Sequence, residues 1–336
     1  MAVPSPIDPW QLDEQEFPVN AALEVQFHFL LQYAILAPSF QNAQPWKFQI
    51  RTDGIDVFAD RLLWRKVADP DQRELLISIG CALENFLIAA EHFGIGHELI
   101  YFPDQGFLDH VATLRLAAGG SASFFRPKSL FDSIPVRHTS HKKHADRKIS
   151  DRHFELLRSC LTETDIHLHF SADAAIQRKV DDLLVRGNVL QFADGCYRQE
   201  VAQLIGQGAL GTSWLVSKLG ELAHTHLNRG KAESQRDSEL LMSSPAIGVI
   251  CSGTNDRTAY VKSGQVYQRI GLLAASMGIW LQPMSHIVEV PELRKDLAQL
   301  IPIPDVVPQH PFRLGFGEPE AKHTPRRPLS DLLVDM

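Results

Sequence analysis

Two long apolar stretches, residues 74–93 and 260–278, match each other at a constant offset of 184 residues. Each is apolar on nearly every face, and each ends at a glycine followed by an isoleucine and an extended segment. Three pairs coincide at this offset: Gly80 with Gly264, Ala90 with Ala274, and Gly94 with Gly278. A helix that is apolar all round must be buried. The repeat therefore predicts two central helices, one in each of two similar half-units.

Short strand patterns surround both helices. They lie at residues 46–50, 55–57, 97–102, 111–117, 166–170, 246–251 and 312–316. Together with further helices at 151–161 and 174–190, they predict an α+β fold made by duplication of one unit. The two copies are expected to pack as the subunits of a homodimer do. We place the first half at residues 20–131 and the second at 132–330.

An insertion at about residues 198–240 distinguishes the second half from the first. It contains "LIGQGALGTSW" followed by a polar, charged stretch that ends near Arg236. Such a segment is either a surface excursion or a lid over a pocket.

Composition excludes several classes of protein. The 336 residues are 44% hydrophobic and 22% charged, which is typical of a globular protein. The net charge is −7, and no basic run is interleaved with aromatic residues, so we expect no nucleic-acid partner. The chain has no uninterrupted apolar run of membrane length and no basic-then-apolar signal pattern. The four cysteines are scattered, so we expect a reduced, cytoplasmic protein with no membrane partner.

Fifteen histidines raise the possibility of a metal site. They include the run His138, His141 and His144 and two H-x-H pairs, but none lies in an H-E-x-x-H or facial-triad context. We therefore expect no metal.

Four segments carry a family resemblance. They are "LAPSFQNAQPWKF" at 36–48, "IPVRHTSHK" at 134–142, "SGQVYQRIGLLAASMGIWLQPMS" at 263–285, and the C-terminal "RLGFGEP…PRRP" that starts at 313. In this order and spacing they resemble the FMN-dependent nitroreductase superfamily. The likeness is to its Acg-like branch in particular, in which one chain imitates the usual homodimer.

The resemblance implies an FMN cofactor and the residues that contact it. The contacts to the phosphate, the ribityl chain and the ring edge would be Arg137, His138, Thr139, His141, Arg326 and Arg327. The contacts from across the boundary between the halves would be Pro38, Ser39, Asn42 and Gln44, and those beside the reactive face of the ring Pro283, Met284 and Ser285. Arginine suits the phosphate because its planar fork matches the phosphate oxygens.

The chain departs from the family pattern at three places. His141 stands where the family usually has Lys or Arg, so the charge at this contact depends on pH. Phe40 stands where many members have a second serine. Met284 and Ser285 replace an acidic residue and a glycine, so a carboxylate that many members carry is missing.

Each segment also has a plain structural interpretation. Arg137 could be a solvated surface charge, residues 283–285 a turn, and residues 325–328 a disordered basic end. Ser39 and Asn42 could be simple turn formers, since both residue types favour turns.

A symmetric dimer of this family has two flavin sites, yet the sequence has parts for one. Residues 1–19 contain no arginine, and "RSCLTETDIHLHF" at 158–170 stands where a second Pro-Ser-Asn turn would fall. The sequence therefore predicts one FMN per chain, in a monomer that acts as a pseudo-dimer and could associate further.

The resemblance implies hydride transfer through the flavin from NAD(P)H to a nitroaromatic, a quinone or a similar electrophile. The cofactor performs this chemistry, so we assign no catalytic residue. The alternative is an FMN storage or sequestration protein with little turnover, because a lid fills the substrate pocket.

Overall fold

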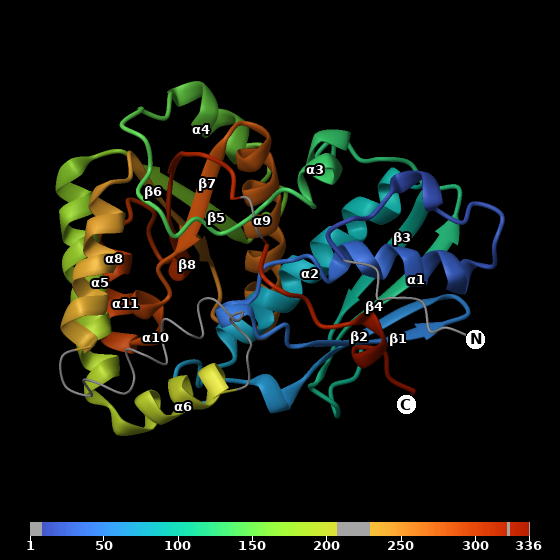
Figure 1. Cartoon of the computed structure of the whole chain (residues 1–336), viewed down its shortest axis with the longest axis horizontal. Coiled ribbons are helices and arrows are strands. Elements are labelled where there is room, and N and C mark those ends of the chain that lie inside the picture. Colours follow the sequence, from blue (N-terminus) through green and yellow to red (C-terminus); the bar gives the residue numbers. More distant parts are fainter. Residues whose placement is uncertain (1–8, 207–228, 321–322, 336) are drawn as a thin grey trace.

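The computed structural model describes residues 9–206, 229–320 and 323–335. Its strands form two four-stranded antiparallel sheets that lie side by side (Figure 1). The first has the order β1-β2-β4-β3, with β1 (Trp46–Arg51), β2 (Gly54–Ala59), β3 (Ile95–Tyr101) and β4 (His110–Ala118). The second has the order β5-β6-β8-β7, with β5 (Ile166–Ser171), β6 (Ala246–Ser252), β7 (Ile279–Pro283) and β8 (Val307–Phe316). The same order recurs in both sheets, which confirms the predicted α+β fold with two tandem half-units.

Helices pack on these sheets. The first half contains α1 (Leu23–Ala34), α2 (Arg73–His92) and α3 (Lys128–Ser133). The second contains α4 (Asp151–Arg158), α5 (Ala174–Ala193), α6 (Gly195–Gly206), α8 (Arg229–Met242), α9 (Arg257–Ser276), α10 (His286–Glu289) and α11 (Pro291–Gln299). The predicted boundary between residues 131 and 132 falls inside α3, and the bounds of the two halves stay a prediction.

The central helices α2 and α9 cross in the middle of the molecule (Figure 1). A Cβ atom on Gly80 would lie 2.1 Å from the carbonyl oxygen of Val261, and one on Gly264 would lie 2.0 Å from that of Ile77. Ile77 and Val261 are themselves 184 residues apart, so the two contacts are exchanged by the repeat. The crossing is therefore two-fold symmetric, and both glycines are needed for the close approach.

Helix α2 has the length and apolar character of a membrane span, but 94% of its most apolar window is buried inside the protein. Its burial comes from α9 and α1 and from the first sheet. Continuous apolar sequence here reflects a core helix.

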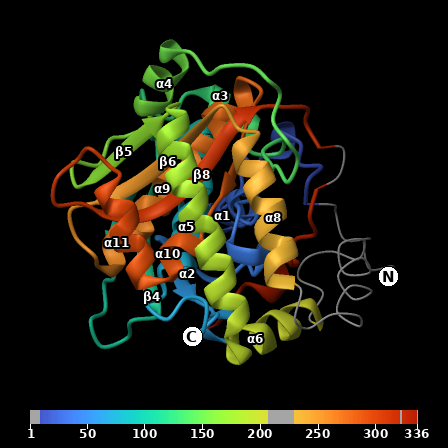
Figure 2. The same ribbon diagram turned by 90° about the vertical axis from the view of Figure 1, so that its left-hand side faces the viewer.

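The two halves differ in what covers the outer face of the sheet. Helices α5, α8, α10 and α11 cover this face in the second half (Figure 2) and share an apolar cluster with β6, including Leu184, Leu241 and Val249. Among the described residues, the first sheet has no comparable helical layer. Most of the predicted lid falls on residues 207–228, between helices α6 and α8. Residues 207–228 lie outside the described residues.

The C-terminal segment crosses from the second half to the first (Figure 1). The Phe48 N–H donates to the Leu332 carbonyl at 2.8 Å, and the Val334 N–H donates to the Phe48 carbonyl at 2.9 Å. These bonds extend the edge of β1 and bury Leu332. They also bring the basic residues 326 and 327 onto the first half.

Candidate functional site

The loop after α1 has an unusual backbone. Helix α1 ends at Ala34, and the loop that follows contains three non-glycine residues with positive φ. They are Gln41 (51°), Asn42 (54°) and Gln44 (52°). Such residues persist only where surrounding contacts hold them, and they are enriched at functional sites.

The contacts that hold this loop are visible. The Ser39 hydroxyl accepts the Gln44 N–H at 2.9 Å, and the Phe40 N–H donates to the Ser78 hydroxyl of α2 at 2.9 Å. Ser39 therefore does form the turn, as its residue type predicts, and the loop is tied to the start of α2.

Two predicted flavin contacts from this loop bind the C-terminal segment. The Asn42 side-chain amide donates to the Pro325 carbonyl at 3.2 Å, and its oxygen accepts from Arg326 at 3.0 Å. The Gln44 side-chain oxygen accepts the Arg327 N–H at 2.8 Å. The structure thus brings together residues 38–44 and 325–327, which are nearly 300 positions apart in the chain.

Arg137 is buried, with 7% of its surface exposed. Its N–H closes the turn after α3 by donating to the Ser133 carbonyl at 2.9 Å, and its side chain runs against Gly271 of α9. The Nε atom has no hydrogen-bond partner among the described residues, and burial lowers the pKa of the guanidinium. A solvated surface charge is therefore excluded.

Arg326 is a second, partly buried cation whose Nε atom is buried without a hydrogen-bond partner among the described residues. It donates to the carbonyls of Leu36 (3.1 Å) and Ala37 (3.3 Å), and its guanidinium lies 4.6 Å from the ring of Trp10. Burial, together with the nearby charge of Arg137, lowers its pKa to about 9. Among the described residues neither arginine pairs with a carboxylate, so two like charges interact at a place where one is buried and the other partly buried. Such a pair is costly unless an anion joins it.

Arg327 points elsewhere. Its guanidinium lies 3.4 Å from the Asp60 carboxylate and 3.2 Å from the Gln44 carbonyl. The two C-terminal arginines therefore differ: the charge of Arg137 acts on Arg326, whereas Arg327 pairs with Asp60.

The residues after Arg137 run along β7. The His138 ring stacks on Trp280 with centroids 4.0 Å apart, and its buried Nε2 atom has no partner among the described residues. Burial lowers the pKa of His138 to about 4, so the imidazole is neutral at pH 7. Thr139 forms a parallel bridge with Leu281, while His141 is exposed with its Nδ1 atom 3.3 Å from the Gln282 side-chain nitrogen.

The segment 283–285 differs from its predicted extended form. Pro283 ends β7, the Met284 N–H donates to the Pro311 carbonyl at 2.8 Å, and Ser285 already has helical dihedral angles (φ −62°, ψ −30°). The Met284 side chain is 4% exposed and packs in the apolar cluster of the outer helical layer. The Met284 side chain is thus part of the hydrophobic core, because the outer helical layer is present in the second half.

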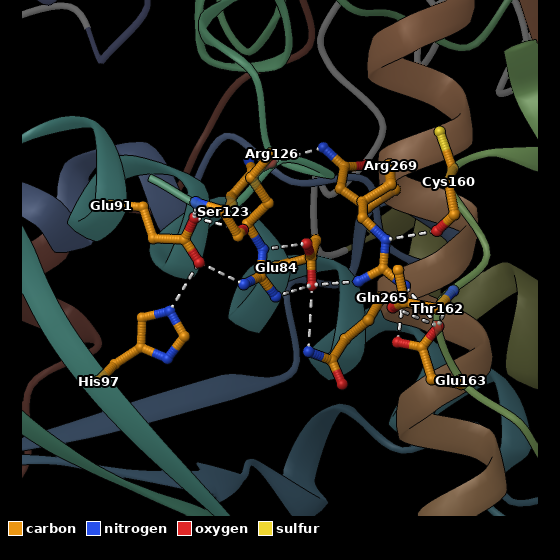
Figure 3. Close-up of polar contacts among 12 residues, drawn as sticks. Glu84, Glu91, His97, Ser123, Arg126, Cys160, Thr162, Glu163, Gln265 and Arg269 are labelled. Atoms are coloured by element: carbon orange, nitrogen blue, oxygen red, sulfur yellow. Dashed lines mark hydrogen bonds and ion pairs between the residues drawn. The ribbon is translucent and has the colours of Figure 1, made fainter. Parts of the chain in front are cut away.

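A second polar region lies across the central helices, and sequence reasoning missed it. Figure 3 shows Glu84 of α2 between two arginines: its oxygens lie 2.7 Å from Arg126 Nε and 3.0 Å from a terminal nitrogen of Arg269. Arg126 also binds Glu91 at 2.6 Å, and Arg269 binds Glu163 at 2.6 Å. We call these five residues the charged network. All are strongly buried except Glu163, whose side chain is 14% exposed.

The repeat relates part of this network to a neutral pair. At the offset of 184 residues, Glu84 corresponds to Gln268 and Arg269 corresponds to Asn85. Gln268 and Asn85 also meet, with the glutamine amide donating to the asparagine oxygen at 2.6 Å. One contact across the helix crossing is therefore an ion pair, and its symmetry mate is an amide pair.

No group of three or more His, Cys, Asp or Glu side chains within residues 9–206, 229–320 and 323–335 is arranged to hold a metal ion. The histidines noted in the sequence are separated by the structure. His138 stacks on Trp280, whereas the His144 Nδ1 atom lies 3.0 Å from the Ser244 hydroxyl.

A scan against protein-family models finds no match. Among curated relatives, "Putative NAD(P)H nitroreductase Rv3131" of Mycobacterium tuberculosis is 23% identical over 316 residues, which cover 90% of each chain. "Putative NAD(P)H nitroreductase acg" of the same organism is 24% identical over 318 residues, which cover 90% of this chain and 93% of the relative.

Solved structures with a similar chain include the FMN-dependent nitroreductase NfnB from Mycobacterium smegmatis in complex with NADPH. Its TM-score is 0.38 at 12% identity, over 57% of this chain and 88% of NfnB. A nitroreductase-like family protein from Bacillus cereus has a TM-score of 0.39 at 13% identity, over 66% and 99% of the two chains. The alignments with the two M. tuberculosis proteins confirm the resemblance predicted from the motifs: this chain is a homologue of the Acg-like nitroreductases.

Proposed function

We propose that the protein binds one FMN between its two halves and works as an NAD(P)H-dependent oxidoreductase of the nitroreductase type. The observation that carries the proposal is the pair of arginines, the buried Arg137 and the partly buried Arg326, whose buried Nε atoms are unpartnered and which have no carboxylate partner in the described chain. A dianionic phosphate matches two guanidinium groups in both charge and geometry. The orphaned Nε atoms of both residues are consistent with such a ligand.

The neighbouring residues fit the rest of the cofactor. The neutral His138, with its unpartnered Nε2 atom, can hydrogen-bond to a polar group of the ligand, and the Trp280 ring fixes its orientation. The strained loop at 39–44 covers the site from the first half, and the C-terminal segment holds that loop in place. Bound FMN would supply hydride transfer between NAD(P)H and a nitroaromatic or quinone acceptor. The chain itself orients the two partners and excludes water.

The charged network supports a single flavin per chain. Residues 159–165 follow α4 as the loop 35–45 follows α1, so they stand where a second loop would lie. There the Cys160 carbonyl and the Glu163 carboxylate are bound by Arg269 at 2.9 Å and 2.6 Å. Carboxylates of the chain already neutralise the arginines at this place.

The test compares FMN with riboflavin, which lacks the phosphate. In Arg137→Met, FMN affinity should fall by about 1.5–3 kcal/mol, or roughly 10- to 150-fold, because a charge-assisted contact is lost. Riboflavin affinity should change little. Fluorescence titration of cofactor-free protein measures both, and the FMN titration should end at one equivalent.

Arg115→Met is the control, since this arginine is exposed on β4. Equal loss of FMN and riboflavin affinity in Arg137→Met would place the phosphate elsewhere. An end point near two FMN per chain would contradict the single site.

The sequestration alternative has one structural observation in its favour. Helix α6, at the start of the insertion, contacts the first half: the Glu200 carboxylate accepts the N–H groups of Val67 and Ala68 at 3.2 Å and 3.0 Å. The insertion is therefore anchored on both halves. Stopped-flow mixing of the FMN complex with NADH or NADPH separates the two functions. Rapid bleaching of the flavin absorbance supports the reductase, and persistent absorbance with both donors supports sequestration.

A further inference from the structure

Arg313 on β8 is a buried arginine to which no function has been assigned. Its side chain is 1% exposed. Burial lowers its pKa to about 10 despite the charge of Asp237, and within the described part of the chain it forms no ion pair with a carboxylate. Burying a charge in this way is costly. An apolar residue at this position would be buried at a lower free-energy cost. The benefit of the charged side chain must therefore lie in the hydrogen bonds that it forms.

These hydrogen bonds join two separate segments. One terminal nitrogen of Arg313 donates to the carbonyls of Ser140 and Lys142, each at 2.9 Å. Its Nε atom donates to the Gln282 side-chain oxygen at 2.7 Å. Ser140 and Lys142 follow directly after Arg137–Thr139, and Gln282 directly precedes Pro283. The fork of a single guanidinium thus spans the two segments that flank the candidate site.

The second terminal nitrogen secures the same loop further along. It donates to the Ser244 hydroxyl at 3.2 Å and lies 3.1 Å from His144 Nδ1, which must act as the acceptor because arginine only donates. A single backbone bond joins the segments directly, from the Ser140 N–H to the Leu281 carbonyl at 3.1 Å. Arg313 therefore contributes three polar contacts to this loop, to the Ser140 and Lys142 carbonyls and to His144.

The repeat provides an internal comparison for this residue. Arg313 pairs with Gln282 across β7 and β8, and Arg115 pairs with Glu98 across β3 and β4 at the equivalent register. The Arg115 side chain is 62% exposed and forms an ordinary surface ion pair with Glu98 at 3.3 Å. The same strand position is thus a solvated arginine in one half and a buried clamp in the other. The clamp occurs on the side of the candidate flavin site.

We propose that Arg313 is a positioning residue that fixes the spacing between residues 137–141 and 283–285, and thereby the shape of the flavin site. The proposal rests on the proposed function, since the two segments are the expected flavin contacts. It does not require Arg313 to touch the cofactor.

The experiment measures FMN affinity and backbone amide exchange in Arg313→Met, with Arg115→Met as the matched control. In Arg313→Met, FMN affinity should fall about tenfold or more, since several hydrogen bonds that hold the contacts are lost. The amide of Ser140 should exchange faster, because its bond to Leu281 loses support. Arg115→Met should change neither quantity.

Two further variants separate positioning from charge and from general stability. Arg313→Lys keeps the charge but cannot form the fork, so it should restore little of the affinity; full restoration would overturn the clamp. Ile247→Val truncates the cross-strand neighbour of Arg313 on β6 and lowers the melting temperature without touching the loop. An equal loss of FMN affinity in Ile247→Val would also overturn the proposal.

Should Arg313→Met fail to fold, Gln282→Leu removes one arm of the clamp and should show the same changes to a smaller degree. Failure of the proposed function is recognised separately. If the wild-type protein binds no FMN, the proposed function fails, and amide exchange at residues 137–142 becomes the test of Arg313. Unchanged exchange in the Arg313 variants would then mean that the residue does not position the loop.

Discussion

Two polar places near the crossing of α2 and α9 handle the charge of arginine in opposite ways. In the charged network, Arg126 and Arg269 meet Glu84, Glu91 and Glu163 (Figure 3). At the candidate site, Arg137 and Arg326 meet no carboxylate of the described chain. Arginine is thus paired with carboxylates of the chain in one place and with none of the described chain in the other.

The pKa values follow this difference. Burial by itself disfavours the charge of Glu84, but Arg126 and Arg269 outweigh it and hold the pKa of this carboxyl below its usual value. At the other place burial dominates and lowers the pKa of Arg137 and Arg326. Which side chains accompany an arginine therefore decides whether its charge is compensated within the chain.

The largest expected effect comes from removing the shared carboxylate of the network. Glu84→Gln leaves Arg126 and Arg269 buried with less compensating charge, so the free energy of unfolding should fall by about 3–5 kcal/mol. Urea unfolding measures it. The symmetry-related variant Gln268→Leu loses only a neutral hydrogen bond and should cost about 1 kcal/mol. Equal costs would show that the ion pair at Glu84 and the amide pair at Gln268 contribute alike to stability, against the prediction.

The next prediction concerns the crossing of α2 and α9 itself. Gly80→Ala and Gly264→Ala each drive a methyl group into a backbone carbonyl of the opposite helix, so each should cost about 1–3 kcal/mol through overpacking. The double variant should cost less than the sum, because one separation of the helices relieves both clashes. Thermal unfolding tests this, with Gly253→Ala, which meets nothing within 4 Å, as the control. Strongly unequal costs would argue against a symmetric crossing.

The last prediction is a pH dependence of stability on the side of the candidate site. Burial, with the charge of Arg313, lowers the pKa of His144 to about 3, below the value of about 6.5 in an unfolded chain. The unfolded state then binds one more proton between these two pH values. Stability is therefore complete above about pH 6.5 and falls as the pH drops, by about 1.4 kcal/mol per unit.

His144→Asn keeps an acceptor for Arg313 and should remove this part of the slope, as measured by urea unfolding from pH 7.5 to 4.5. The exposed His28→Asn should leave the slope unchanged. An identical slope in wild type and His144→Asn would mean that His144 is not held neutral.

Much of the fold was predictable because local pattern and burial agree. The apolar run at 74–93 became α2 (Arg73–His92), and the run at 260–278 became α9 (Arg257–Ser276), each followed by a glycine with positive φ. The 184-residue repeat predicted two half-units with related crossing contacts. The last strand was predicted too short. It was expected at residues 312–316, but β8 starts at Val307, because the prolines at 308 and 311 obscured the strand pattern.

The candidate site was only partly predictable. The motif residues 38–44 and 325–327 do come together, and the charge of Arg137 acts on Arg326, although their contacts to a flavin stay a prediction. Asn42 and Gln44 bind the C-terminal segment, and Met284 packs in the core, because distant segments compete for the same side chains. Arg313 lay within a quoted motif but had no role, since its burial depends on the whole second half.

The sequence by itself determined the two central helices, the α+β class and the segments that surround the site, because periodicity, helix ends and repeats are properties of neighbouring residues. Tertiary structure alone decided which arginines are neutralised. Arg115 and Arg313 are the same residue at the same strand position, and so look alike in sequence. Only the packing around each determines that one stays in water while the other is buried among carbonyls, where its charge can organise a site.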